Sequence, residues 1–256
     1  MSINSYLSEL ASNLVLSDYE KNGISTSINT LKFRADSYFS GLEEIKIFGS
    51  YDRQTILPRK VDENSDIDIM LVFENKDNYK PQSFLNRIKQ FVEKYYSRSE
   101  IYQSSPTIVL ELNHIKFELT PAYVSYGCCY IPNGPFNWKY TNPDGFHGDL
   151  LECNKNNNFK IKPTIRLIKY WNIKNNNRDL ESFFLEEKIA EKMKYSYFTC
   201  TSNTEYLING LEVLKYYTDY KKINNSIDII KEALENEKDG MPYTALSKIK
   251  KLFPEI

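Results

Sequence analysis

The sequence predicts a mixed α/β lobe followed by a lobe made only of helices. Between residues 43 and 120, apolar and polar residues alternate in several short runs, which is typical of half-buried strands. Beyond residue 145, apolar residues recur every three or four positions, as in amphipathic helices. A stretch rich in Tyr, Gly, Pro and Asn separates the two patterns. We therefore expect two lobes, residues 1–135 and 136–256.

The elements follow from the same periodicities. Two helices are expected near residues 4–20 and 24–40, with a break at Asn22-Gly23. The predicted strands are EEIKIF, SDIDIMLVF and runs near 100–103, 107–112 and 114–120, with a helix near 81–97. After Pro121 we expect an irregular loop between the lobes. The second lobe should contain helices near 145–154, 161–173, 179–194, 203–219, 226–236 and 242–252.

Charge and cysteine content narrow the class of protein. The 256 residues carry 33 Lys and Arg against 34 Asp and Glu, so the chain lacks the basic excess expected of a protein that holds long nucleic acid. The four cysteines show neither zinc nor disulfide spacing, which favours a reducing compartment. No apolar run approaches the roughly 18 residues that span a bilayer, so we expect a cytoplasmic protein without membrane contact.

Two carboxylates in SDIDIMLVF indicate a metal site. On a strand, Asp66 and Asp68 share one face and the intervening isoleucines take the other. Like charges this close repel, and a divalent cation would neutralise them. A solvated strand end is the alternative for the pair alone.

The dipeptide Gly49-Ser50 directly follows EEIKIF. A residue without a Cβ lets the backbone approach a phosphate, and the serine can donate hydrogen bonds to its oxygens. In HIKFELTPAY, Glu118 supplies a third carboxylate on an alternating run. With two Mg²⁺ or Mn²⁺ ions, this set would serve an in-line attack of a hydroxyl on an α-phosphate with pyrophosphate as the leaving group.

The chain resembles the polymerase-β nucleotidyltransferase superfamily and, within it, the bacterial cyclic oligonucleotide synthases of anti-phage signalling. These are relatives of oligoadenylate synthase and cyclic GMP-AMP synthase. The matching segments are FGSYDRQT, SDIDIML, FELTPAY, RLIKYWN and LESFFLE, which span residues 48 to about 187. The resemblance implies a polymerase-β-like N-lobe, a helical C-lobe, NTP substrates, a cyclic or linear oligonucleotide product and a downstream effector that binds it.

The resemblance also implies residue roles. Donor phosphates would be held by Gly49 and Ser50, and both metal ions by Asp66, Asp68 and Glu118. The triphosphate would contact Lys169, and the nucleotide would contact Ser182 and Phe183, with the phenyl ring stacked on a base. From the residues alone, Lys162, Arg166 and Lys169 fall at i, i+4 and i+7 and so form one basic stripe along a helix.

One position departs from the family pattern. The family usually has Asp at the third carboxylate, and Glu118 is one methylene longer. A catalytically impaired nucleotide-binding regulator is therefore an alternative to a synthase. Nucleotide transfer to an RNA or protein acceptor is another, because the same N-lobe serves all these reactions.

Overall fold

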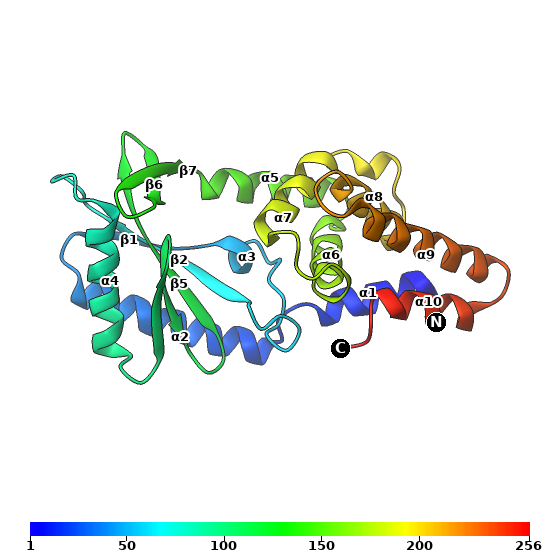
Figure 1. Ribbon diagram of the computed structural model, residues 1–256, viewed down its shortest axis with the longest axis horizontal. Coiled ribbons are helices and arrows are strands. Elements are labelled where there is room, and N and C mark those ends of the chain that lie inside the picture. Colours follow the sequence, from blue (N-terminus) through cyan, green and yellow to red (C-terminus); the bar gives the residue numbers. More distant parts are fainter. The chain divides into compact units, whose positions relative to one another are not determined.

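The structure, a computed structural model, describes residues 1–256 and divides the chain into two compact units (Figure 1). The first, which we call the sheet unit, comprises Leu16–Arg53 and Glu63–Gly145. The second, the helical unit, comprises Met1–Val15, Gln54–Asp62 and Phe146–Ile256. Each unit has its own hydrophobic core, and each is described by itself below.

The sheet unit is built on seven strands in the order β1-β2-β5-β4-β3, with β6 paired to β5 and β7 paired to β6. The strands are β1 (Leu42–Phe48), β2 (Asp66–Phe73), β3 (Glu100–Ser104), β4 (Thr107–Glu111), β5 (Lys116–Ser125), β6 (Cys128–Asn133) and β7 (Asn137–Thr141). Only β2 and β5 run parallel, and all other pairs are antiparallel. The predicted mixed sheet is confirmed.

Helices accompany the sheet in this unit (Figure 1). They are α2 (Asp18–Tyr38), the single turn α3 (Gly49–Asp52) and α4 (Pro81–Tyr95). The apolar face of α4, including Phe84, Ile88 and Phe91, is buried. This helix packs on β3, β4 and β5, and α2 packs on α4.

The break between the first two helices lies earlier than predicted. The helix α1 spans Ile3–Asn13, and α2 begins at Asp18 and runs through Asn22-Gly23 without interruption. Ser17 and Glu20 form a capping box: the Ser17 amide donates to Glu20 (2.8 Å) and the Glu20 amide to the Ser17 hydroxyl (3.2 Å). The capping box satisfies free backbone N–H groups at the start of α2, so the helix begins at Asp18 and accommodates Gly23 in its interior.

The loop predicted after Pro121 is wrong, because β5 continues to Ser125 and the hairpin β6–β7 follows. Tyr126 and Gly127 have φ of +50° and +75° and join β5 to β6 as a two-residue turn with both residues in the left-handed region. Pro121 lies beside Leu71 of β2, beyond the residues of β5 that pair with β4. Its missing N–H therefore removes no bond to β4.

The helical unit confirms the all-helical pattern beyond residue 145. Its elements are α1, α5 (Pro143–Asn156, which starts in the sheet unit), α6 (Ile161–Asn175), α7 (Ser182–Lys192), the 3₁₀ turn η1 (Ser196–Phe198), α8 (Asn203–Leu214), α9 (Tyr220–Lys238) and α10 (Pro242–Leu252). Helix α6 is the centre of the core, with Ile165, Ile168 and Trp171 each fully buried. None of the helices in the chain is both long and apolar enough to cross a membrane.

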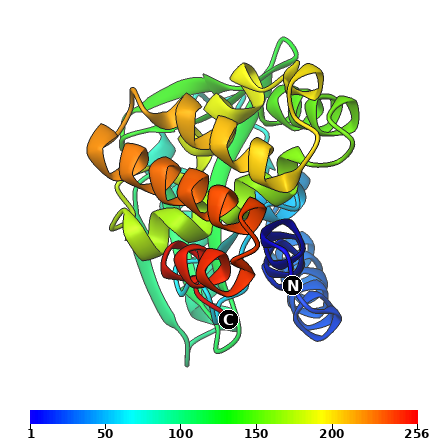
Figure 2. The ribbon, with the colours of Figure 1, turned by 90° about the vertical axis from the view of Figure 1, so that its right-hand side faces the viewer.

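Helix α1 belongs to the helical unit, although the expected division placed residues 1–135 together. Its apolar face, including Ile3, Leu7 and Leu10, joins the core of α6 and α8. The Tyr6 hydroxyl donates to the Phe253 carbonyl (2.6 Å). Figure 2 shows α1 in dark blue beside α10 in red, which lies along α9 in orange. The sheet unit also continues ten residues past the expected boundary, to Gly145, because residue 135 lies within the β6–β7 hairpin.

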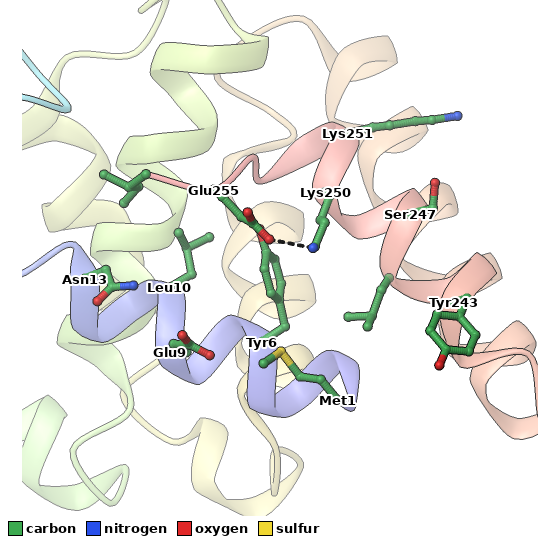
Figure 3. A pocket seen from close by; sticks show the side chains of 12 residues that line it. Met1, Tyr6, Glu9, Leu10, Asn13, Tyr243, Ser247, Lys250, Lys251 and Glu255 are labelled. Atoms are coloured by element: carbon green, nitrogen blue, oxygen red, sulfur yellow. Dashed lines mark hydrogen bonds and ion pairs between the residues drawn. The ribbon is translucent and has the colours of Figure 1, made fainter.

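A surface cavity of about 820 Å³ lies between α1 and α10 (Figure 3). Tyr6 and Glu9 border it from α1, and Tyr243 and Lys250 from α10. The Lys250 ammonium is paired with Glu255 (2.5 Å). The lining of the cavity therefore contains both acidic and basic side chains, and it includes none of the residues predicted to bind nucleotide.

Candidate active site

The Gly49-Ser50 turn lies at the end of β1, as predicted. Gly49 has a φ of +74° and opens α3, which packs against β2. A Cβ atom on this residue would lie 1.7 Å from Oδ2 of Asp68. Glycine is therefore required both by the backbone conformation and by the carboxylate beside it. Ser50 is the second residue of α3.

The strand register brings the three predicted carboxylates to neighbouring positions. Asp66 and Asp68 alternate with buried isoleucines at the start of β2. In the parallel pairing of β2 with β5, Asp68 stands beside Glu118, and Asp66 stands beside Lys116. Because adjacent strands lie about 4.8 Å apart, the side chains on this face can share one cation.

Lys116 lies among these carboxylates. Its ammonium is 3.2 Å from Oδ2 of Asp66 and 3.2 Å from Oε1 of Glu118. The Lys116 side chain is 14% exposed, and those of Asp66 and Glu118 are 28% and 25% exposed. The ammonium therefore bridges two of the three carboxylates in a half-buried setting.

Burial and mutual repulsion perturb the two aspartates. Burial, together with the Glu118 charge, raises the pKa of Asp66 to about 6 although Lys116 opposes the shift. Burial and then the charges of Asp66 and Glu118 raise the pKa of Asp68 to about 7, against the opposing charges of Arg53 and Lys116. The two cationic side chains thus leave part of the negative charge uncompensated.

The three carboxylates offer the kind of oxygen ligands that divalent cations bind. Carboxylate oxygens are the ligands that Mg²⁺ and Mn²⁺ prefer, and the uncompensated charge favours a further cation. As the side chains stand, no group of three or more Asp, Glu, His or Cys residues is arranged to hold a metal ion. Lys116 is bonded to one oxygen of Asp66 and one of Glu118, so this ammonium competes with any cation that the three carboxylates would share.

The other predicted residues lie in the helical unit. The basic stripe exists on α6, but Lys162, Arg166 and Lys169 are all buried. Arg166 donates to the Gln54 carbonyl (3.0 Å), and Lys169 donates to the Thr55 carbonyl (3.2 Å). Burial lowers the pKa of Arg166 to about 10. The stripe therefore holds the segment Gln54–Asp62 within its own unit.

Lys169 also has an anionic partner that the sequence pattern did not indicate. Its ammonium lies 2.5 Å from Oε1 of Glu186 on α7, and the Thr55 hydroxyl donates to the same oxygen (2.7 Å). The two charged side chains are 6% and 0% exposed. A triphosphate contact by Lys169, which stays a prediction, would have to compete with this buried pair.

Ser182 and Phe183 open α7 on the surface of the helical unit. Ser182 is exposed, and the Phe183 ring is 51% exposed and makes a T-shaped contact with Phe146 at 5.2 Å between centroids. The next ring, Phe184, packs on Tyr217 instead. The two adjacent rings therefore have different surroundings, and the nucleotide contacts of Ser182 and Phe183 stay predictions.

A turn after one strand, paired carboxylates on the next strand and a third on its parallel neighbour are the arrangement that the sequence predicted for a nucleotidyltransferase. Residues 1–154 match the Second Messenger Oligonucleotide or Dinucleotide Synthetase domain, and the chain belongs to this family. The family resemblance inferred from the sequence is thereby confirmed.

Relatives and solved structures agree with this placement. A "Probable cyclic nucleotide synthase" of Bacillus cereus and a "Cyclic AMP-AMP-AMP synthase" of Acinetobacter sp. are each 27% identical, over 195 and 199 residues. The matches cover 61% and 73% of this chain and 57% of each relative, so the chain spans little more than half their length. The structure of CdnC from Escherichia coli MS115-1 with ATP matches with a TM-score of 0.76 at 12% identity, covering 100% of this chain and 98% of CdnC, which shows the shared fold.

Proposed function

We propose that this protein joins nucleoside triphosphates into a cyclic or linear oligonucleotide second messenger and releases pyrophosphate. The observation that carries the proposal is the register of β2, which pairs Asp68 with Glu118 on one side and with Phe48, directly before Gly49, on the other. The family match and the names of the two relatives support it. The product would act on a downstream effector in the cytoplasm, as part of anti-phage signalling.

In the proposed reaction a ribose hydroxyl of one nucleotide attacks the α-phosphorus of an NTP. A P–O bond forms to the hydroxyl oxygen, the bond to the pyrophosphate oxygen breaks, and the hydroxyl proton is released. Two bound Mg²⁺ or Mn²⁺ ions would supply charge stabilisation and a lowered hydroxyl pKa. Asp66, Asp68 and Glu118 would hold the ions, and the Gly49-Ser50 turn would bind donor phosphates through N–H and O–H groups.

In the helical unit, Lys169 would reach a donor phosphate only after leaving Glu186. A triphosphate carries more charge than one carboxylate, so it could take over the ammonium. Ser182 and Phe183, both exposed at the start of α7, would contact the nucleotide, with the ring stacked on its base.

The test is a synthesis assay with α-³²P-labelled NTPs, singly and in mixtures, with Mg²⁺ and then Mn²⁺. ATP comes first because the Acinetobacter relative is named for a product made only from AMP units. The catalytic variant is Asp66→Ala, Asp68→Ala, and the matched control removes two exposed carboxylates of the same unit, Asp36→Ala, Asp77→Ala. We expect a phosphatase-resistant product with wild type and control and none with the catalytic variant.

Absence of product from every NTP mixture would count against the proposal. Glu118 then favours a second candidate, a nucleotide-binding regulator with impaired turnover, because the family usually has the shorter Asp at this position. Recovery of synthesis in Glu118→Asp would locate the impairment at that side chain. Label transferred to added RNA or protein, dependent on Asp66 and Asp68, would instead identify a different acceptor.

A further inference from the structure

Lys116 is a cation that bonds two of the predicted metal-binding carboxylates and that the proposed chemistry does not use. It lies two residues before Glu118 on β5, so both side chains leave the same face of the strand. Its contacts to Asp66 and Glu118 are equal, at 3.2 Å each. An ammonium equidistant from two carboxylates occupies the position between them that a bridging cation would need.

Repulsion between the three carboxylates explains why a cation beside them stabilises the site before a metal ion binds. Three carboxylates stand on two adjacent strands, and two basic side chains, Lys116 and Arg53, act on Asp68. Without Lys116, Asp66 and Glu118 would face each other with no counter-ion bonded to either. The ammonium therefore offsets the repulsion between Asp66 and Glu118 while the site awaits its substrates.

We propose that Lys116 is a positioning residue that acts as a built-in competitor for the divalent cation. Metal entry displaces the ammonium from Asp66 and Glu118, so Lys116 lowers the affinity of the free protein for metal. When an NTP brings the metal ion, the triphosphate neutralises part of the charge of that ion. The displaced ammonium can then bind a phosphate oxygen. This inference rests on the proposed metal-dependent function.

The first experiment measures Mn²⁺ binding by electron paramagnetic resonance without nucleotide. Lys116→Gln removes the competing charge, and we expect its Kd for Mn²⁺ to fall by about tenfold, because a unit charge beside a divalent ion is strongly repulsive at this distance. The conservative variant Lys116→Arg keeps the charge and should not tighten binding. The matched control Lys76→Gln removes an exposed ammonium past the far end of β2, roughly 20 Å from Asp66 at about 3.3 Å per strand residue.

A second measurement uses the wild-type chain and so does not depend on how the variant folds. Amine-reactive labelling of Lys116, read by mass spectrometry against Lys76, should rise severalfold when Mg²⁺ is added. Unchanged Mn²⁺ affinity in Lys116→Gln, or an unchanged labelling ratio, would overturn the inference while leaving the metal site standing. No Mn²⁺ binding by wild type or by Lys116→Gln at millimolar metal, with or without a non-hydrolysable ATP analogue, would instead refute the proposed metal-dependent function itself.

Discussion

The contact between Gly49 and Asp68 gives the sharpest prediction. In Gly49→Ala the new Cβ would lie 1.7 Å from Oδ2, 2.6 Å from Cγ and 3.0 Å from Cβ of Asp68. The backbone at φ +74° adds about 1 kcal/mol for a residue with a side chain. Expulsion of the carboxylate or a shift of β1 against β2 adds about 1–3 kcal/mol, as in other overpacked sites. We expect a total loss of about 2–4 kcal/mol in the free energy of unfolding.

The matched control is Gly127→Ala in the same unit. Gly127 has nearly the same φ, +75°, but a Cβ there would meet no atom within 4 Å. Its cost should be the conformational part alone, about 1 kcal/mol. The double variant Gly49→Ala, Asp68→Ala removes the carboxylate that clashes and leaves only the Cβ contact at 3.0 Å. Within that background the alanine at position 49 should cost about 1–2 kcal/mol.

Urea unfolding of these variants and of Asp68→Ala gives the energies, and Mn²⁺ titration reports on the carboxylate. Gly49→Ala should weaken Mn²⁺ binding by at least about tenfold, a loss of about 1.4 kcal/mol in binding free energy, and Gly127→Ala should leave it unchanged. The reasoning is refuted by equal destabilisation in the two single glycine variants, or by a Gly49→Ala penalty that persists in full when Asp68 is alanine. Either result would mean that the carboxylate does not fill the space beside the turn.

Three further outcomes are expected. Lys169→Met should lower the free energy of unfolding by about 3–5 kcal/mol because it leaves the buried Glu186 charge without this ammonium, and adding Glu186→Leu should recover part of that loss in urea unfolding. Ser17→Ala should cost about 1 kcal/mol by removing the cap of α2, with a smaller loss disproving the role of the capping box. Burial raises the pKa of the Cys153 thiol to about 11 from its ordinary 9.0, so its alkylation at pH 8 should be roughly 100-fold slower in the native protein than in urea, and equal rates would contradict that burial.

Hydrophobic periodicity predicted most of the helices and strands. It failed at two places, where glycine or proline residues suggested a break that the chain does not have. The apolar spacing of α6 is that of a buried helix face, and Ile165, Ile168 and Trp171 do lie in the core. At the N-terminus, Gly23 suggested a helix break, but the capping box of Ser17 satisfies helix donors and a single glycine costs only about 1 kcal/mol. Strands β6 and β7 were hidden by the glycines and prolines of this stretch, yet Tyr126 and the glycine after it form the two-residue turn of the hairpin between β5 and β6.

The sequence identified the side chains of the candidate site, but it did not predict most of the contacts between them. Alternation placed Asp66 and Asp68 on one face and gave Glu118 as a third carboxylate on another strand, but only the pairing of β2 with β5 sets the third carboxylate beside the second. The same alternation puts Lys116 on the face of Glu118, so the sequence did carry a signal for this ammonium. Lys169 and Glu186 lie seventeen positions apart in sequence, on two different helices, and no spacing rule identifies such a contact.

The buried face of the two central strands explains how the fold holds three like charges together. Opposite the carboxylates, β2 and β5 present side chains that are each fully buried: Ile67, Ile69, Phe117 and Leu119. Each contributes about 1.5–3 kcal/mol by burial, which together exceeds the few kcal/mol that desolvated carboxylates cost. A slip of one residue between the strands would turn these apolar side chains to solvent and the carboxylates into the core. The hydrophobic face therefore fixes the register, and the register keeps Asp68 beside Glu118, so the core supplies the precision that the proposed chemistry needs.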